Sequence, residues 1–130
     1  MRIAIIGATG MVGREILKII ENKGINKNNE LFLYASSKSS GKEICVGEKL
    51  YKVSELDKKK LKNKYDFAIF SAGKLISLQW AGEFTKRGAF VIDNSSAFRR
   101  DKDKALVVPE INFNSIKKSL TKCEGFKAWL

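Results

Sequence analysis

Residues 1–13 read MRIAIIGATGMVG, and this stretch decides the fold. Its first six residues are mostly apolar and β-branched, which is typical of a central parallel strand buried on both faces. Gly7, Gly10 and Gly13 follow at a regular spacing. In a turn between a strand and a helix, the first glycine permits a sharp exit, the second lets the backbone approach a pyrophosphate, and the third lets the helix pack closely. We therefore predict a dinucleotide-binding turn here; the alternative is a glycine-rich turn without a ligand.

The residues after this turn continue an alternation of helices and strands. Helical spacing of apolar residues begins at Met11, and Gly24 stands where a helix C-cap belongs. A second helical spacing runs from Leu75 up to Gly88. Strands are predicted over residues 31–35, 43–53 (one or two short, edge-like strands), 67–70, 90–92 and 105–108, the last closed by Pro109. This order predicts an α/β fold, namely a Rossmann-type, doubly wound, mainly parallel sheet in a single domain.

The net charge of +11, from 25 lysines and arginines against 14 acidic residues, has two interpretations. A basic chain can bind nucleic acid. We favour the alternative, that the lysines lie on solvated faces. The densest run, residues 58–64, contains neither aromatic residues nor glycines that could form a stacking platform for single strands. We therefore expect no nucleic-acid partner.

The chain has two cysteines, Cys45 and Cys123, and no histidine. Without histidine it can form neither a Ser-His nor a Cys-His dyad of its own, and two distant cysteines do not make a zinc site. We expect no metal, a packing role for Cys45 in an edge strand, and an incidental thiol at Cys123.

The apolar runs of the chain are too short to cross a bilayer, and its first residues lack the features of a signal peptide. We therefore expect a cytoplasmic protein with no membrane partner.

A polar loop after the second strand bears on the choice of cofactor. Sites specific for NAD usually place a carboxylate at the tip of this strand, to bind the ribose 2′-hydroxyl. Here the tip carries Ser36, Lys38, Ser39 and Lys42, and no carboxylate occurs between Leu31 and Lys42. Hydroxyl and ammonium groups suit a 2′-phosphate, so NADP is predicted; the alternative is an ordinary polar loop.

Several motifs, in matching order and spacing, give the chain a resemblance to a known family. They are residues 7–13, 36–42, 70–73, 93–99 (DNSSAFR) and 107–112 (VVPEIN). Together they resemble the cofactor half of aspartate-semialdehyde dehydrogenase, from residue 1 to about residue 112. The last two motifs are far more specific than the glycine turn.

The resemblance implies a reaction, a pathway and an assembly for the full-length family. Its members reduce L-aspartyl 4-phosphate with NADPH to L-aspartate 4-semialdehyde and phosphate. This step feeds the biosynthesis of lysine, threonine, methionine and, in bacteria, diaminopimelate. The full-length enzymes are homo-oligomers.

The resemblance also implies roles for individual residues. The pyrophosphate would lie against the glycine turn, the 2′-phosphate against the serine loop, and the nicotinamide near Ser71, Ala72, Gly73 and Asn94. Arg99 would bind the phosphate of the substrate, as a guanidinium fork can. The full cofactor-binding set is Gly7, Thr9, Gly10, Met11, Val12, Gly13, Ser36, Lys38, Ser39, Ser71, Ala72, Gly73 and Asn94.

The chain departs from the family pattern at several places. Lys38 stands where arginine is common, and Lys74 where small residues are usual. The family's Pro-Asn-Cys-type nucleophile motif does not follow Asn112, and Cys123 lacks its neighbours. The second domain, with the catalytic histidine, is absent as well. We therefore expect a domain over residues 1–112, a divergent remnant over residues 113–130, no catalytic residue, and no activity of the chain alone.

Two other functions compete with an enzyme fragment. One is a domain like that of the reductase acting on N-acetyl-γ-glutamyl phosphate, a related acyl-phosphate reductase; residues 93–99 favour aspartate semialdehyde over it. The other is a free-standing NADP-binding module without chemistry.

Overall fold

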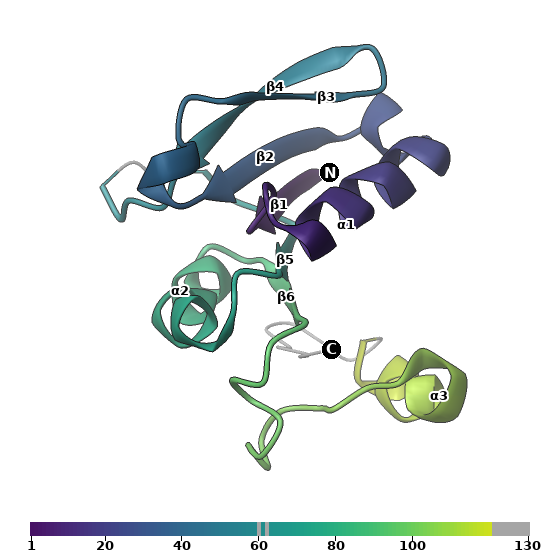
Figure 1. Ribbon diagram of the computed structural model, residues 1–130. Coiled ribbons are helices and arrows are strands. Elements are labelled where there is room, and N and C mark those ends of the chain that lie inside the picture. The colour runs from purple at the N-terminus through teal and green to yellow at the C-terminus, as the bar shows by residue number, and fades with distance from the viewer. Residues whose placement is uncertain (60, 62, 121–130) are drawn as a thin grey trace.

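The computed structural model describes residues 1–59, 61 and 63–120, and shows a six-stranded sheet with the strand order β3-β4-β2-β1-β5-β6 (Figure 1). The strands are β1 (Arg2–Ile6), β2 (Glu30–Ala35), β3 (Glu43–Val46), β4 (Lys49–Glu55), β5 (Phe67–Phe70) and β6 (Phe90–Asp93). The helices are α1 (Met11–Asn22), α2 (Lys74–Lys86) and α3 (Pro109–Leu120), with short 3-10 turns at η1 (Ile25–Lys27) and η2 (Ser37–Ser39).

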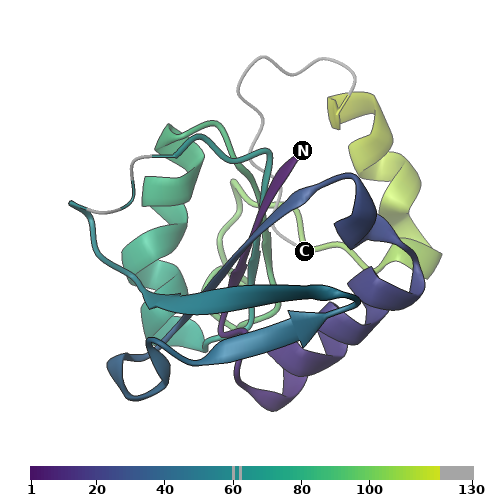
Figure 2. The same cartoon turned by 90° about the horizontal axis from the view of Figure 1, so that it is seen from above.

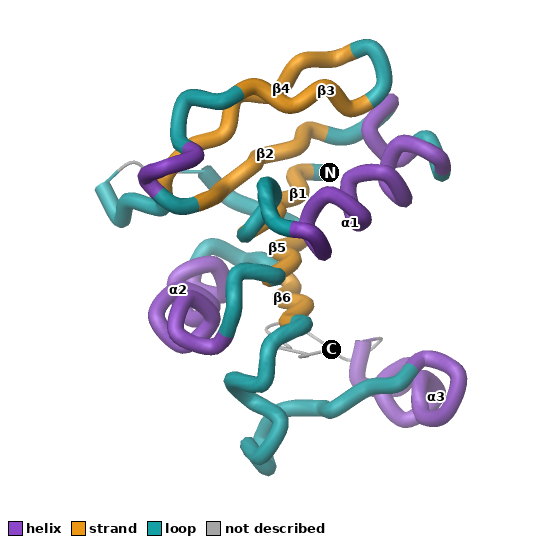
Figure 3. The backbone as a smooth tube through the Cα atoms, in the orientation of Figure 1, coloured by secondary structure: helices purple, strands orange, loops and turns teal. Residues whose placement is uncertain are grey.

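All neighbouring strands of the sheet are parallel except β3 and β4, which form an antiparallel hairpin. From β1 the chain first builds outward through β2 and β4, and then returns to the other side of β1 for β5 and β6 (Figure 3). The order of strands therefore reverses between β1 and β5. In open α/β sheets, ligands bind in the crevice outside the carboxyl ends of the strands at such a point. The predicted doubly wound, mainly parallel sheet is confirmed.

Two hydrophobic layers cover the two faces of the sheet. Alternate residues of β1 enter different layers, so Ala4 and Ile6 pack with α2, while Ile3 and Ile5 pack with α1. Figures 1 and 2 show α2 on one side of the sheet and α1 with α3 on the other. A strand covered on both faces must be apolar at nearly every position, which accounts for the sequence of β1.

The strand predicted over residues 105–108 is wrong, because this segment pairs with no strand of the sheet. Its backbone groups are bonded instead to the side chain of Asn112, which accepts from the Val108 N–H at 2.7 Å and donates to the Leu106 carbonyl at 2.9 Å. The Val108 carbonyl accepts the N–H groups of Ile111 and Asn112 at the start of α3. These bonds occupy backbone groups that would otherwise pair with a neighbouring strand.

The structure also differs from what the sequence predicted for residues 43–53 and for Cys45. Residues 43–53 form two strands, of which β3 lies at the edge and β4 lies between β3 and β2. Cys45 does not pack in the core but is exposed, because Val46 and Ile44 turn toward the α1 layer and Cys45 faces the other way. Cys123 lies outside the described residues. The helix α3 crosses residue 112, and the boundary expected there stays a prediction.

Candidate functional site

A cavity of about 470 Å³ opens at the carboxyl ends of β1, β2 and β5. We call it the glycine-turn cavity. Its lining comes from the end of β1 and the turn after it, the residues at the ends of β2, β4 and β5, and α2. It is lined by Ile6, Gly7, Thr9, Gly10, Ala35, Ser36, Glu55, Leu56, Ser71, Ala72, Ile76, Gln79 and Trp80.

Two glycines of the turn are required by the close approach of main chain to main chain. Gly7 has φ +91°, and a Cβ there would lie 2.8 Å from the Ser71 carbonyl carbon. A Cβ on Gly13 would lie 2.1 Å from the Gly7 oxygen, well inside van der Waals contact. Gly10 is less constrained, with the nearest atom 3.4 Å from such a Cβ. The requirement for glycine at positions 7 and 13 thus follows from the packing of the main chain, whereas at position 10 the packing demands it less.

The amino terminus of α1 begins directly after this turn. The Arg14 N–H is the first to bond back, to the Gly10 carbonyl at 2.9 Å, and no side chain caps the helix. The N–H groups of Met11, Val12 and Gly13 therefore precede the first helical bond, at the positive end of the helix dipole. Arg14 also donates from Nε to the Thr9 carbonyl at 3.2 Å, which fixes the turn. A pyrophosphate is the type of ligand that such a terminus binds.

The serine loop after β2 lies beside the glycine turn. Thr9 Oγ1 donates to Ser39 Oγ at 3.4 Å. The loop is also bonded to β4, because the Gly41 N–H donates to the Val53 carbonyl and the Val53 N–H donates to the Lys42 carbonyl. Ser36 lines the glycine-turn cavity, whereas Lys38 and Ser39 lie in η2 without lining it.

A second cavity, of about 320 Å³, lies beyond β6, and we call it the Arg99 cavity. It brings together Asn94 and Arg99, which the sequence assigned to the cofactor and to the substrate phosphate. The complete lining is Asp93, Asn94, Ser95, Phe98, Arg99, Ala105, Leu106 and Val107. The segment predicted as a strand, residues 105–108, thus contributes one wall of this cavity.

Asp93, at the end of β6, holds the loop that lines the Arg99 cavity. Its side chain is buried and accepts three hydrogen bonds, from Ser77 Oγ of α2 at 2.9 Å, the Ser95 N–H at 2.9 Å and Ser95 Oγ at 2.8 Å. Ser95 Oγ in turn accepts the Ala97 N–H at 3.0 Å. The first residue of the motif therefore acts on the fold of the loop, whereas Asn94 and Arg99 are exposed and face the cavity.

Several residues around the glycine-turn cavity were missed by the sequence analysis. Ile76, Gln79 and Trp80 belong to α2. The helical spacing that begins at Leu75 did not indicate them, because Leu75 itself is exposed and the buried face of α2 carries Ser77, Trp80, Ala81 and Phe84. Glu55 ends β4 and Leu56 follows it. The sequence could not place them at the cavity, because Glu55 reaches Ala35 only through the pairing of β2 with β4. Conversely, Met11, Val12, Gly13 and Gly73 do not line this cavity, and Lys74 is an exposed first residue of α2.

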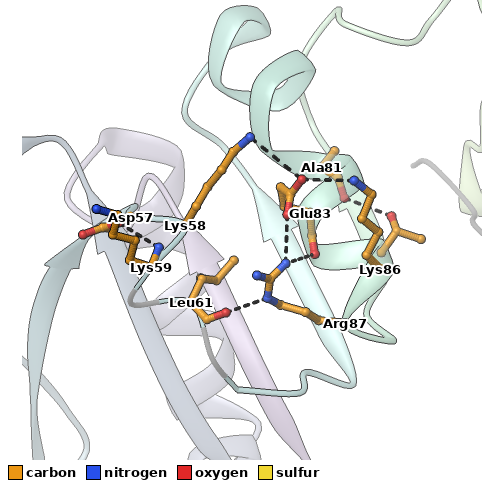
Figure 4. Close-up of polar contacts among 9 residues, drawn as sticks. Asp57, Lys58, Lys59, Leu61, Ala81, Glu83, Lys86 and Arg87 are labelled. Carbon is orange, nitrogen blue, oxygen red and sulfur yellow. Dashed lines mark hydrogen bonds and ion pairs between the residues drawn. The ribbon is translucent and has the colours of Figure 1, made fainter.

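The segment after Leu56 is fastened to α2 by charged groups (Figure 4). Arg87 donates to the Leu61 carbonyl at 2.6 Å and to Glu83 Oε2 at 3.0 Å. Lys86 and Lys58 also lie against the Glu83 carboxylate, at 3.2 and 3.9 Å. The hydrogen bonds from Arg87 and then Lys86 lower the pKa of Glu83. These contacts hold Lys58 and Leu61 near the carboxyl end of α2.

A pair of tyrosines, one of them in β2, lies on the face of the sheet that α2 covers. Tyr34 and Tyr65 share a hydrogen bond of 2.6 Å between their hydroxyls in the α2 layer. Burial, and then this bond, raise the pKa of Tyr34, so its hydroxyl stays neutral. The Tyr34 carbonyl accepts the N–H groups of Gly7 and Ala8 at 2.8 and 3.0 Å, which ties the glycine turn to β2.

Within the described residues, no group of three or more cysteine and acidic side chains could hold a metal ion. In the same part of the chain, no helix is long and apolar enough to cross a membrane.

The sequence matches, over residues 2–119, the protein family described as "Semialdehyde dehydrogenase, NAD binding domain". The chain belongs to this family. The aspartate-semialdehyde dehydrogenase of Aquifex aeolicus (strain VF5) is 48% identical to this NAD-binding domain over 116 residues. That of Campylobacter jejuni is 46% identical over 117 residues. Both alignments cover 89% of this chain and 34% of the relative, so the chain spans about a third of the length of these relatives.

A solved structure places the same domain in a larger protein. Aspartate semialdehyde dehydrogenase II from Vibrio cholerae, complexed with ASA, matches this NAD-binding domain with a TM-score of 0.80 and 36% identity. The match covers 99% of this chain and 41% of that protein. The resemblance drawn from the motifs is confirmed.

Proposed function

We propose that this chain is the cofactor-binding part of an aspartate-semialdehyde dehydrogenase and that its cofactor is NADP(H). The observation that carries the proposal is the glycine-turn cavity, which is lined by Gly7, Thr9 and Gly10, the residues that lead directly into α1. A pyrophosphate fits this arrangement, because it needs N–H donors and close approach of the backbone. The relatives named above support aspartate semialdehyde over N-acetyl-γ-glutamyl phosphate as the substrate of the whole enzyme.

Each predicted residue then has a task in cofactor binding. Thr9, Gly10, Met11 and Val12 surround the pyrophosphate, and the loop with Ser36, Lys38 and Ser39 holds the adenosine 2′-phosphate. Ser71, Ala72 and Gly73 lead from this cavity toward the nicotinamide, which supplies hydride when bound.

The Arg99 cavity completes the proposed path of the ligands. Asn94 holds the nicotinamide end, and Arg99, beside it in the same cavity, binds the phosphate of the acyl phosphate. The hydrogen bonds that Asp93 accepts fix the loop that carries Asn94 and Arg99. Cofactor and substrate therefore meet beside this loop.

This assignment is tested by calorimetric titration of the chain with NADPH and with NADH. We expect tighter binding of NADPH, because a charge-assisted contact to the 2′-phosphate contributes about 1.5–3 kcal/mol, or roughly tenfold or more in affinity. Lys38→Ala should remove most of the preference for NADPH. Lys23→Ala, which changes an exposed lysine at the far end of α1, is the matched control and should leave it unchanged. Equal or tighter binding of NADH by the original chain would contradict the choice of NADP.

We further propose that the 130-residue chain has no dehydrogenase activity alone. Reduction of an acyl phosphate needs a nucleophile held beside the nicotinamide, and neither Cys45 nor Cys123 lies in the family's nucleophile motif. The chain also contains no histidine to serve as a general base. Phosphate-dependent reduction of NADP by aspartate semialdehyde, measured at high protein concentration, should stay at background. The roles in lysine, threonine, methionine and diaminopimelate synthesis, homo-oligomer formation and cytoplasmic location belong to the whole enzyme and stay predictions.

A further inference from the structure

The end of β4 brings a carboxylate to the part of the cavity assigned to the adenosine. Glu55 is the last residue of β4 and is paired in register with Ala35, the residue that precedes Ser36. Glu55 and Ser36 both line the glycine-turn cavity. The stretch after β2 has no carboxylate of its own, so β4 supplies the acidic group that this stretch lacks.

The carboxylate of Glu55 lies at the surface of the molecule. Its side chain is exposed and makes no hydrogen bond or ion pair within the described residues. Glu48 shares this property, whereas Glu30 pairs with Arg2 and Glu83 lies among three cations. Glu55 also lines the neighbouring cavity, whose lining includes Lys52 and Asp57. An anion entering beside Ser36 therefore meets a carboxylate as well as the lysines of the loop.

A carboxylate at this position acts in opposite directions on the two forms of the cofactor. It accepts a hydrogen bond from a free ribose 2′-hydroxyl, which is the usual device of NAD sites. It repels a 2′-phosphate, which carries about two negative charges. From its place in the cavity we propose that Glu55 is a specificity-determining residue, which favours NADH and reduces the preference for NADPH that the serine–lysine loop creates. This inference rests on the proposed dinucleotide function.

The test compares Glu55→Gln with the original chain in titrations against NADPH and NADH. Glutamine keeps the size of the side chain and removes its charge. We expect NADPH to bind more tightly and NADH more weakly, so that the ratio of the two dissociation constants changes about tenfold in favour of NADPH. Because surface charges are screened, the gain for NADPH should shrink as salt rises from about 0.05 to 0.5 M.

The matched control is Glu48→Gln in the turn between β3 and β4, which removes an exposed carboxylate at the other end of β4. It should leave the ratio unchanged while changing the net charge by the same amount. Binding of both cofactors with the same ratio in Glu55→Gln and the original chain would overturn the role of Glu55 and leave the dinucleotide function intact. An equal loss of both cofactors in Glu55→Gln would overturn it too, since the residue would then not distinguish them. Failure of the original chain to bind either cofactor would overturn both proposals.

Discussion

The glycine-turn cavity and the Arg99 cavity lie at the same edge of the sheet but are built in different ways. The first is shaped by main chain, because Gly7 and Gly13 leave no room for a Cβ against neighbouring backbone. The second is shaped by side chains, through the bonds that Asp93 accepts and the apolar segment that ends in Val107. Substitution of either glycine should therefore disturb the fold, whereas substitution of Asp93 should disturb one loop.

The largest effect is expected at Gly13, where the contact is with backbone that cannot move aside. Gly13→Ala should lower the free energy of unfolding by about 3 kcal/mol, because the new methyl group overlaps the Gly7 carbonyl. Urea denaturation measures this loss. Gly82→Ala is the control, since it adds a methyl group to an exposed helix position with nothing within 4 Å. It should raise stability by up to about 1 kcal/mol. If the free energy of unfolding of Gly13→Ala were no lower than that of Gly82→Ala, the close main-chain packing at Gly13 would not be required for the fold.

A smaller and more local loss is expected at Asp93. Asp93→Asn should cost about 2 kcal/mol, because the amide has one accepting oxygen in place of two, so an NH2 donor must face a group that now donates to Asp93. Faster hydrogen exchange at Ser95 and Ala97, with little change in β1, would locate the loss in the loop. Asp101→Asn serves as the comparison. It keeps an oxygen that can accept the Asp103 N–H and removes only the ion pair with Lys104, so it should cost less than about 1 kcal/mol. Equal effects of the two substitutions would contradict the special place of Asp93.

The same contrast explains which features the sequence reveals. The glycine turn, β1 and α1 could be predicted because their signals are local, as glycine spacing and apolar periodicity. Residues 105–108 could not, because the competitor of a strand there is the side chain of Asn112, several residues away. An apolar run does not show whether its backbone will pair with a strand or with an amide.

The candidate site divides in a similar way. Asn94 and Arg99 are separated by four residues in one motif, and the structure brings them to one cavity. Glu55 was missed because it reaches Ser36 only through the pairing of β2 with β4. Cys45 was assigned to packing because the face it takes depends on the register of the hairpin, which its sequence leaves open.

The smallest effect concerns the charged cluster that fastens residues near Leu61 to α2. The pKa of Glu83 is lowered in the folded chain, so its contribution to stability is present above about pH 4.5 and is lost as the pH falls through the lowered pKa. The melting temperature of Glu83→Gln should therefore lie below that of the original chain near pH 7, and the two should converge under acid conditions. Glu15→Gln, which removes an exposed pair with Lys18, should show a smaller difference near pH 7. A difference for Glu83→Gln that grew toward low pH would have the wrong sign.

Amide NMR shifts during titration with NADPH test most directly whether the glycine-turn cavity, at the ends of β1, β2 and β5, holds a dinucleotide. We predict saturable shifts at Gly7, Gly10, Val12 and Gly13 in the turn, and at Ser36 and Ser71, with little change at Leu50 in the β3–β4 hairpin. NADPH binding with shifts that avoid the glycine turn, or no saturable shift at all, would contradict the account.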